Sequence, residues 1–206
     1  MQMISEGAEA KIYSGKMLGI DVIVKDRIKK PYRIAEIDNP LRHQRTRTEA
    51  KILFLASSSG LNVPSVLLIG RTTLTIKKID GIALHKIIDE NTLPPKKLKK
   101  IISSAGTYAA MLHDLDISHG DLTPANMMVD KRGGLWIIDF GLAEMTPSIE
   151  EKALDLLLMK RSISGAMFNA FLDGYKKKSK RCAEILPRLN EIERRGRYQT
   201  RTLLTG

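Results

Sequence analysis

Short runs of apolar and β-branched residues, separated by turns that contain glycine, fill most of the first 80 residues. Runs of this length and composition are typical of β-strands. Residues 3–15 predict a strand, a turn and a second strand, and further strands are expected over Gly19–Val24, Val63–Ile69 and Thr72–Ile79. Between the third and fourth strands, a helix is expected to open at Asp38–Pro40 and to run to about Ala56.

The rest of the chain follows a mainly helical pattern. The helix that starts at Pro94-Pro95 is amphipathic, because its lysines fall on the side opposite its apolar residues. Two short strands are expected at Met127–Val129 and Leu135–Ile138. Further helices are predicted over Ile82–Asp89, Ile149–Arg161, Gly165–Lys178 and Lys180–Arg195, with Gly196 as the C-cap of the last.

Together these elements predict an α+β chain of two lobes. Residues 1–80 would form a small antiparallel β-sheet lobe with one main helix, and residues 81–196 a reduced helical lobe. Residues 197–206 are expected to form a mobile basic tail. A chain of 206 residues can bury a core of this size.

Two acids and an amide follow the helical stretch, on loops beside the two short strands. Asp121 and Asn126 have the spacing D-x-x-x-x-N of a kinase catalytic loop, and Asp139 opens a D-F-G sequence. Phosphoryl transfer needs an acid beside the attacking hydroxyl and oxygen ligands for Mg²⁺. The order of these motifs favours a bilobal protein-kinase-like fold, with Asp121 as the catalytic residue and Asn126 and Asp139 as Mg²⁺ ligands. The simpler alternative is a hairpin with acidic turn residues.

The first lobe offers candidates for binding ATP phosphates. Gly7 lies in the turn between the first two strands, where backbone N–H groups could approach the phosphates. Lys25 ends an apolar strand, as the phosphate-contacting lysine of kinases does, and Glu49 is the expected ion-pair partner of Lys25. Glu9 is an unusual neighbour for a triphosphate, so it is expected either to point away or to bond another loop.

Several polar residues near the catalytic loop predict structural roles. Asp155 interrupts an apolar helix, and a buried carboxylate without partners costs several kcal/mol. Asp155 is therefore expected to accept hydrogen bonds from the catalytic-loop backbone, although it could instead face water. His119 is expected to pack and to bond backbone, and His113 to be the polar end of its helix. Gly120 replaces the arginine of H-R-D, and only Leu142–Ser148 follow D-F-G before the next helix, so no activation-loop switch is expected.

The charge of the chain favours acidic partners. Lys and Arg number 34 against 23 Asp and Glu, which gives a net charge of +11. Cys182 is the one cysteine, so the chain has no internal disulfide. No run of eighteen apolar residues is present, and the N-terminus does not resemble a signal peptide. We expect a cytoplasmic protein without a membrane partner.

Nearly the whole chain resembles one family, the small atypical protein kinase subunit of the KEOPS/EKC complex, also known as the p53-related protein kinase family. The phosphate-site motifs are shared with other kinase-like families. The resemblance also extends to Arg195-Gly196-Arg197 at the start of the tail. The segments that select this family are the basic block Lys30–Ala50, with Lys30-Pro31-Tyr32-Arg33 and Arg45-Thr46-Arg47-Thr48-Glu49-Ala50, and the helix around Asp155, with Glu151-Lys152-Ala153-Leu154-Asp155-Leu156.

The resemblance implies a Mg-ATP-dependent Ser/Thr kinase or ATPase. It implies two partners, a metal-dependent threonylcarbamoyl transferase and a small helical subunit, which together support N6-threonylcarbamoyladenosine formation in tRNA. On this resemblance Lys77 and Ile79 lie in the connector between the lobes, whose backbone would contact adenine. Lys77 stands where many relatives have an acid, and the tail is less basic than usual around Tyr198-Gln199-Thr200.

Two other functions share some of these features. Aminoglycoside- and choline-kinase-like enzymes also carry H-G-D-L-x-x-x-N, but they usually have helical insertions for the acceptor that this chain lacks. A basic scaffold could bind tRNA or a partner protein and use nucleotide only structurally, although the presence of Lys25, Asp121, Asn126 and Asp139 argues against it.

Overall fold

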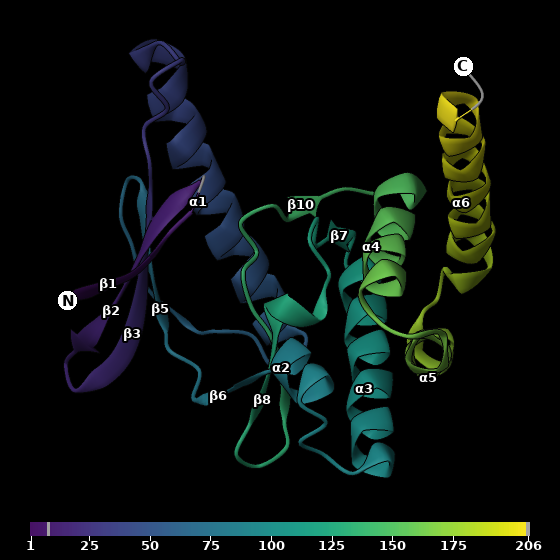
Figure 1. The fold of residues 1–206 in the computed structure, drawn as a ribbon. Helices are drawn as coiled ribbons and strands as arrows, with labels where there is room; N and C mark the ends of the chain where they lie inside the picture. The colour runs from purple at the N-terminus through teal and green to yellow at the C-terminus, as the bar shows by residue number, and fades with distance from the viewer. Residues whose placement is uncertain (8, 205–206) are drawn as a thin grey trace.

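A computed structural model describes residues 1–7 and 9–204, and of residues 196–204 the backbone alone. The chain folds into two lobes joined by one connector (Figure 1). The first lobe is an antiparallel sheet in the order β1-β2-β3-β5-β4, with the long helix α1 packed against β4 and β5. Its elements are β1 (Gln2–Glu6), β2 (Ala10–Met17), β3 (Ile20–Arg27), α1 (Ala35–Ser58), β4 (Val66–Ile69) and β5 (Thr73–Lys77).

The second lobe is mainly helical and carries two small sheets, β6-β8-β9 and β10-β7. Helix α3 runs through its centre and packs closely against α5, while α6 packs against α4 (Figure 1). Its elements are β6 (Gly81–Ala83), α2 (Leu84–Asp89), α3 (Pro95–Asp114), β7 (Ile117–Ser118), the 3₁₀ turn η1 (Pro124–Asn126), β8 (Met127–Asp130), β9 (Leu135–Ile137), β10 (Glu144–Met145), α4 (Ile149–Ser162), α5 (Gly165–Lys178) and α6 (Cys182–Leu204).

Two apolar clusters hold the structure together. One fills the helical lobe, where a Cβ on Gly106 of α3 would lie 1.9 Å from the Phe171 carbonyl oxygen of α5. Only glycine allows so close an approach of the two helices. The other cluster crosses between the lobes, because Ile52 and Leu53 of α1 pack with Ile137 and Phe140 of the second lobe. The C-terminal half of α1 is therefore fixed relative to the D-F-G turn.

Most predicted elements are present, and some of their bounds differ. Helix α1 begins at Ala35 and contains Pro40; the buried Asp38 accepts hydrogen bonds from Lys30 N and Arg42 Nε near its start. Ile82 lies in strand β6, not in the following helix. No helix among the described residues is long and apolar enough to cross a bilayer.

The prediction of Gly196 as a C-cap is wrong, because α6 continues through this glycine to Leu204. A glycine inside a helix costs only about 1 kcal/mol. The preceding part of α6 is held by burial of Ile185 and Leu189 and by the ion pair of Arg188 with Glu150 of α4. Residues 205–206 and the side chains of residues 196–204, which the predicted mobile tail would include, lie outside the description.

Candidate active site

Lys25 lies between two carboxylates at the boundary of the lobes. Its Nζ is 2.8 Å from Glu49 Oε1 on α1 and 2.6 Å from Asp139 Oδ1 at the D-F-G turn. Burial lowers the pKa of Lys25, but attraction to Glu49 and Asp139 outweighs it and raises the pKa above its usual value. Burial raises the pKa of Asp139, but the charge and hydrogen bond of Lys25, together with the hydrogen bond from Gly141 N, outweigh burial and lower the pKa below its usual value. The predicted Lys25–Glu49 ion pair is thus present, and Lys25 and Asp139 are both charged at neutral pH.

Asp121 and Asn126 lie next to this group. The Asn126 side-chain amide donates to the Asp121 carboxylate at 2.7 Å and to the Asp121 carbonyl at 2.9 Å. The Asn126 carbonyl accepts from Ile138 N at 2.9 Å, directly before Asp139. The fold therefore brings the two halves of the kinase motif together. The Asn126 amide orients one oxygen of the Asp121 carboxylate. A general base needs such an orientation, because its oxygen must point at the proton that it accepts.

Asp155 of α4 bonds the backbone of the catalytic loop, as predicted. Asp155 is 1% exposed and accepts hydrogen bonds from His119 N at 2.6 Å and Gly120 N at 2.9 Å. His113 Nε2 and Ser118 Oγ lie 3.2 Å from the same carboxylate. Burial raises the pKa of Asp155, but these hydrogen bonds and the nearby histidines lower it below its usual value.

His119 is fully buried beneath the D-F-G turn. Its Nε2 lies 3.2 Å from the Ile138 carbonyl, and its ring lies 4.8 Å from that of Phe140. Burial lowers the pKa of His119, which keeps the ring neutral. The side chain thus packs and bonds backbone, as expected. His113 is also buried, and it bonds Tyr175 and Asp155 instead of ending its helix in solvent.

Gly120 has a physical reason to replace the usual arginine. Its φ is +76°, and a Cβ there would lie 2.4 Å from the Leu142 carbonyl oxygen. The short segment after D-F-G therefore passes close to the backbone of the catalytic loop at Gly120.

The turn between β1 and β2 is closed by a hydrogen bond from Gly7 N to Ala10 O at 3.0 Å. Glu9 forms an ion pair with Arg45 of α1 at 2.7 Å, so it bonds another element, one of the two predicted outcomes. In the connector, Lys77 N donates to Ser65 O and Lys78 N to Asp21 O. The backbone N–H groups of Lys77 and Lys78 are therefore already bonded within the first lobe. Adenine contacts by Lys77 and Ile79 stay a prediction.

The oxygen-rich side of the cleft suits Mg²⁺ held jointly with a nucleotide. Among the described residues, no group of three or more His, Cys, Asp or Glu side chains forms a complete metal site. Magnesium usually takes one or two protein oxygens together with phosphates and water. The Asp139 carboxylate and the Asn126 side-chain oxygen are donors of that kind, so these residues fit the predicted role.

Sequence reasoning missed one member of the site. Arg27 of β3 bonds Glu49 Oε2 at 2.6 Å, and both side chains are 3% exposed. In the sequence Arg27 is one cation in a long basic stretch, and charged side chains are usually exposed. The available signal was its place two residues after Lys25 on a strand, which puts both side chains on one face.

Comparison with known proteins agrees with this geometry. Residues 17–177 match the RIO domain family. The chain belongs to this family. It is 38% identical to the KEOPS complex subunit Bud32 of Pyrococcus abyssi, with all of both chains covered. It is 31% identical to the EKC/KEOPS complex subunit bud32 of Dictyostelium discoideum, over 96% of this chain and 83% of that protein.

Other relatives are longer. The probable bifunctional tRNA threonylcarbamoyladenosine biosynthesis protein of Methanosphaera stadtmanae is 37% identical over 94% of this chain, which spans 36% of that protein. Among solved structures, the Rio2 kinase-ADP/Mg²⁺-phosphoaspartate complex from Chaetomium thermophilum has a TM-score of 0.62 and 16% identity, with 93% of this chain and 66% of that chain covered.

These relationships confirm the bilobal kinase-like fold and the resemblance to the KEOPS kinase subunit. The chain is a RIO-domain protein related to subunits of the KEOPS/EKC complex.

Proposed function

We propose that this chain binds Mg-ATP between its lobes and transfers the γ-phosphoryl group to a Ser/Thr hydroxyl or to water. One observation supports this most directly: Lys25, Glu49 and Asp139 meet at the same place as Asp121 and Asn126, although they come from both lobes. The side chains include a cation for phosphate, oxygen donors for a metal, and an oriented carboxylate. Phosphoryl transfer needs these three groups together.

Each side chain has a distinct task in this proposal. Lys25 would exchange Asp139 for the α and β phosphates, while Asp139 and Asn126 would hold Mg²⁺, which would supply positive charge against the phosphates. Asp121 accepts the proton of the attacking hydroxyl, and the Asn126 amide keeps its carboxylate in position. Gly7 lies in the turn that would cover the phosphates, and Glu49 orients Lys25.

We further propose that the chain acts in a KEOPS complex that supports N6-threonylcarbamoyladenosine formation in tRNA. Its partners would be a metal-dependent threonylcarbamoyl transferase and a small helical subunit, with tRNA contacted in the assembly. Relatives named for threonylcarbamoyladenosine biosynthesis carry a second segment of about two thirds of their length, which supports a stable association with such a partner. We propose a cytoplasmic location, where tRNA is available.

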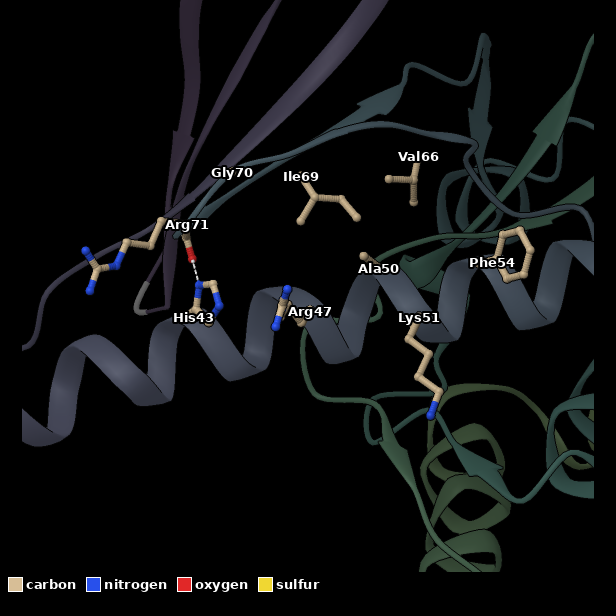
Figure 2. A pocket seen from close by; sticks show the side chains of 9 residues that line it. All are labelled: His43, Arg47, Ala50, Lys51, Phe54, Val66, Ile69, Gly70 and Arg71. Carbon is tan, nitrogen blue, oxygen red and sulfur yellow. Dashed lines mark hydrogen bonds between the residues drawn. The ribbon is translucent and has the colours of Figure 1, made fainter.

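A groove between α1 and β4 supports contact with a partner protein. Figure 2 shows Val66 and Ile69 across from Ala50 and Phe54, with cationic side chains along the helix. Phe54 is 69% exposed and Ile69 is 50% exposed. Exposed apolar residues of this kind mark interaction surfaces, and the basic rim of His43, Arg47, Lys51 and Arg71 favours an acidic partner face.

Loss of the γ-phosphate of ATP, measured with and without Mg²⁺, tests the chemistry. Asp121→Asn should lower the rate by about 100-fold, the range expected of a lost general base. Asp173→Asn, an exposed acid on α5, is the matched control and should keep the rate. A normal rate for Asp121→Asn would rule out its role. Purification of the chain from its native cell tests the proposed assembly, and the transferase should co-purify. Analysis of tRNA nucleosides from the same cells tests the link to the modified adenosine.

A further inference from the structure

Glu49 is shared between two cations. Lys25 Nζ lies 2.8 Å from Oε1, and Arg27 Nη2 lies 2.6 Å from Oε2, so each carboxylate oxygen has its own partner. Glu49 and Arg27 are each 3% exposed at the side chain. A charge-assisted hydrogen bond in a buried place is among the strongest polar contacts in proteins. The bond from Arg27 alone could therefore hold Glu49.

The two cations differ in what they can reach. Lys25 also contacts Asp139, whose side chain is 54% exposed and borders the cleft. Arg27 is enclosed: its Nη1 is buried and has no hydrogen-bond partner among the described residues. Its backbone is fixed by Thr72 O, which accepts from Arg27 N, and by Arg42 of α1, which donates to Arg27 O. Lys25 therefore borders the cleft through its contact with Asp139, and Arg27 has no such contact.

We propose that Arg27 is a positioning residue that keeps Glu49, and with it α1, in place while Lys25 exchanges Asp139 for phosphate. Without Arg27, Glu49 would depend on Lys25 alone. A shift of Lys25 toward phosphate would then weaken the one ion pair that holds this buried carboxylate. This inference rests on the proposed ATP-dependent activity.

Other contacts along α1 hold the helix in a fixed position relative to both lobes. Glu9 of the β1–β2 turn is paired with Arg45, and the buried Asp38 accepts from Lys30 N at the end of the sheet. At its other end, α1 packs on Phe140 through the cluster that crosses between the lobes. Together with the short segment over Gly120, these contacts describe a site that stays assembled without an activation-loop switch.

A double-mutant cycle in the ATP assay tests whether Arg27 acts through Glu49. Arg27→Gln should lower the rate constant about tenfold, and Arg27→Lys should restore part of it. In a Glu49→Gln background, Arg27→Gln should have little further effect, since the carboxylate that it holds is gone. Arg161→Gln, an exposed arginine on α4, is the control. If the rate reduction of the double variant equals the product of the reductions caused by Arg27→Gln and Glu49→Gln alone, the proposal is overturned.

Hydrogen exchange gives a readout that does not need activity. In the nucleotide-free protein, Arg27→Met should speed exchange of the α1 amides around Glu49 relative to those of α3, by about tenfold. Lys25→Met should change this ratio much less, because Arg27 still holds Glu49. An equal or larger effect of Lys25→Met would overturn the proposal. If the intact chain releases no γ-phosphate, the proposed function fails, and this comparison still decides the role of Arg27.

Discussion

Asp155→Asn should destabilise the chain through the catalytic loop. The carboxylate accepts from His119 N, Gly120 N and Ser118 Oγ at 1% exposure. Hydrogen bonds to a charged group are worth about 1.5–3 kcal/mol each. Asparagine keeps one acceptor oxygen and places an NH₂ against a backbone donor. The variant should therefore lose about 3 kcal/mol, which lowers the Tm of a chain of this size by about 6–12 °C.

Thermal unfolding followed by circular dichroism measures this loss, with Asp173→Asn as the exposed control. The pH dependence gives a second check. The pKa of Asp155 is lowered in the folded state, so its contribution is present above its unfolded pKa of about 3.9 and is lost as pH falls through the folded value. The difference between wild type and variant should shrink in acid below about pH 4. A variant as stable as wild type at neutral pH would refute this account of the loop.

Two further predictions concern the same loop. Gly120→Ala should cost about 3 kcal/mol, because its Cβ would meet the Leu142 carbonyl; Gly133→Ala, also at positive φ but with open space, should cost about 1 kcal/mol. Urea unfolding compares the two, and equal losses would contradict the close approach. The lowered pKa of His119 means that the unfolded chain takes up a proton that the folded chain does not, so stability should fall as pH drops below about 6.5. His119→Gln should weaken this pH dependence, and an unchanged slope would assign it to other groups.

The kinase-like order of the motifs along the chain was enough to predict the meeting of Lys25, Glu49, Asp121 and Asp139. Asp155 was predictable for a different reason. A carboxylate inside an apolar helix needs donors, and the nearby loop had backbone N–H groups to offer.

Arg27, Asp38 and the end of α6 were not predictable by the same reasoning. Arg27 and Asp38 are buried with charged or backbone partners that only the folded chain brings near them. A single sequence assigns such residues to a solvated surface, because charged side chains are usually exposed. Gly196 has the residue type of a helix end, and the packing of α6 on α4 outweighs its weak preference.

The most direct test of the joint Mg-ATP site is the affinity for ATP, measured by calorimetry with and without Mg²⁺ in wild type, Asp139→Asn and the exposed control Asp89→Asn. We predict that Mg²⁺ strengthens ATP binding to wild type and the control at least tenfold more than to Asp139→Asn, because Asp139 is the carboxylate of the D-F-G turn beside Lys25. An equal gain from Mg²⁺ in all three proteins would contradict the account.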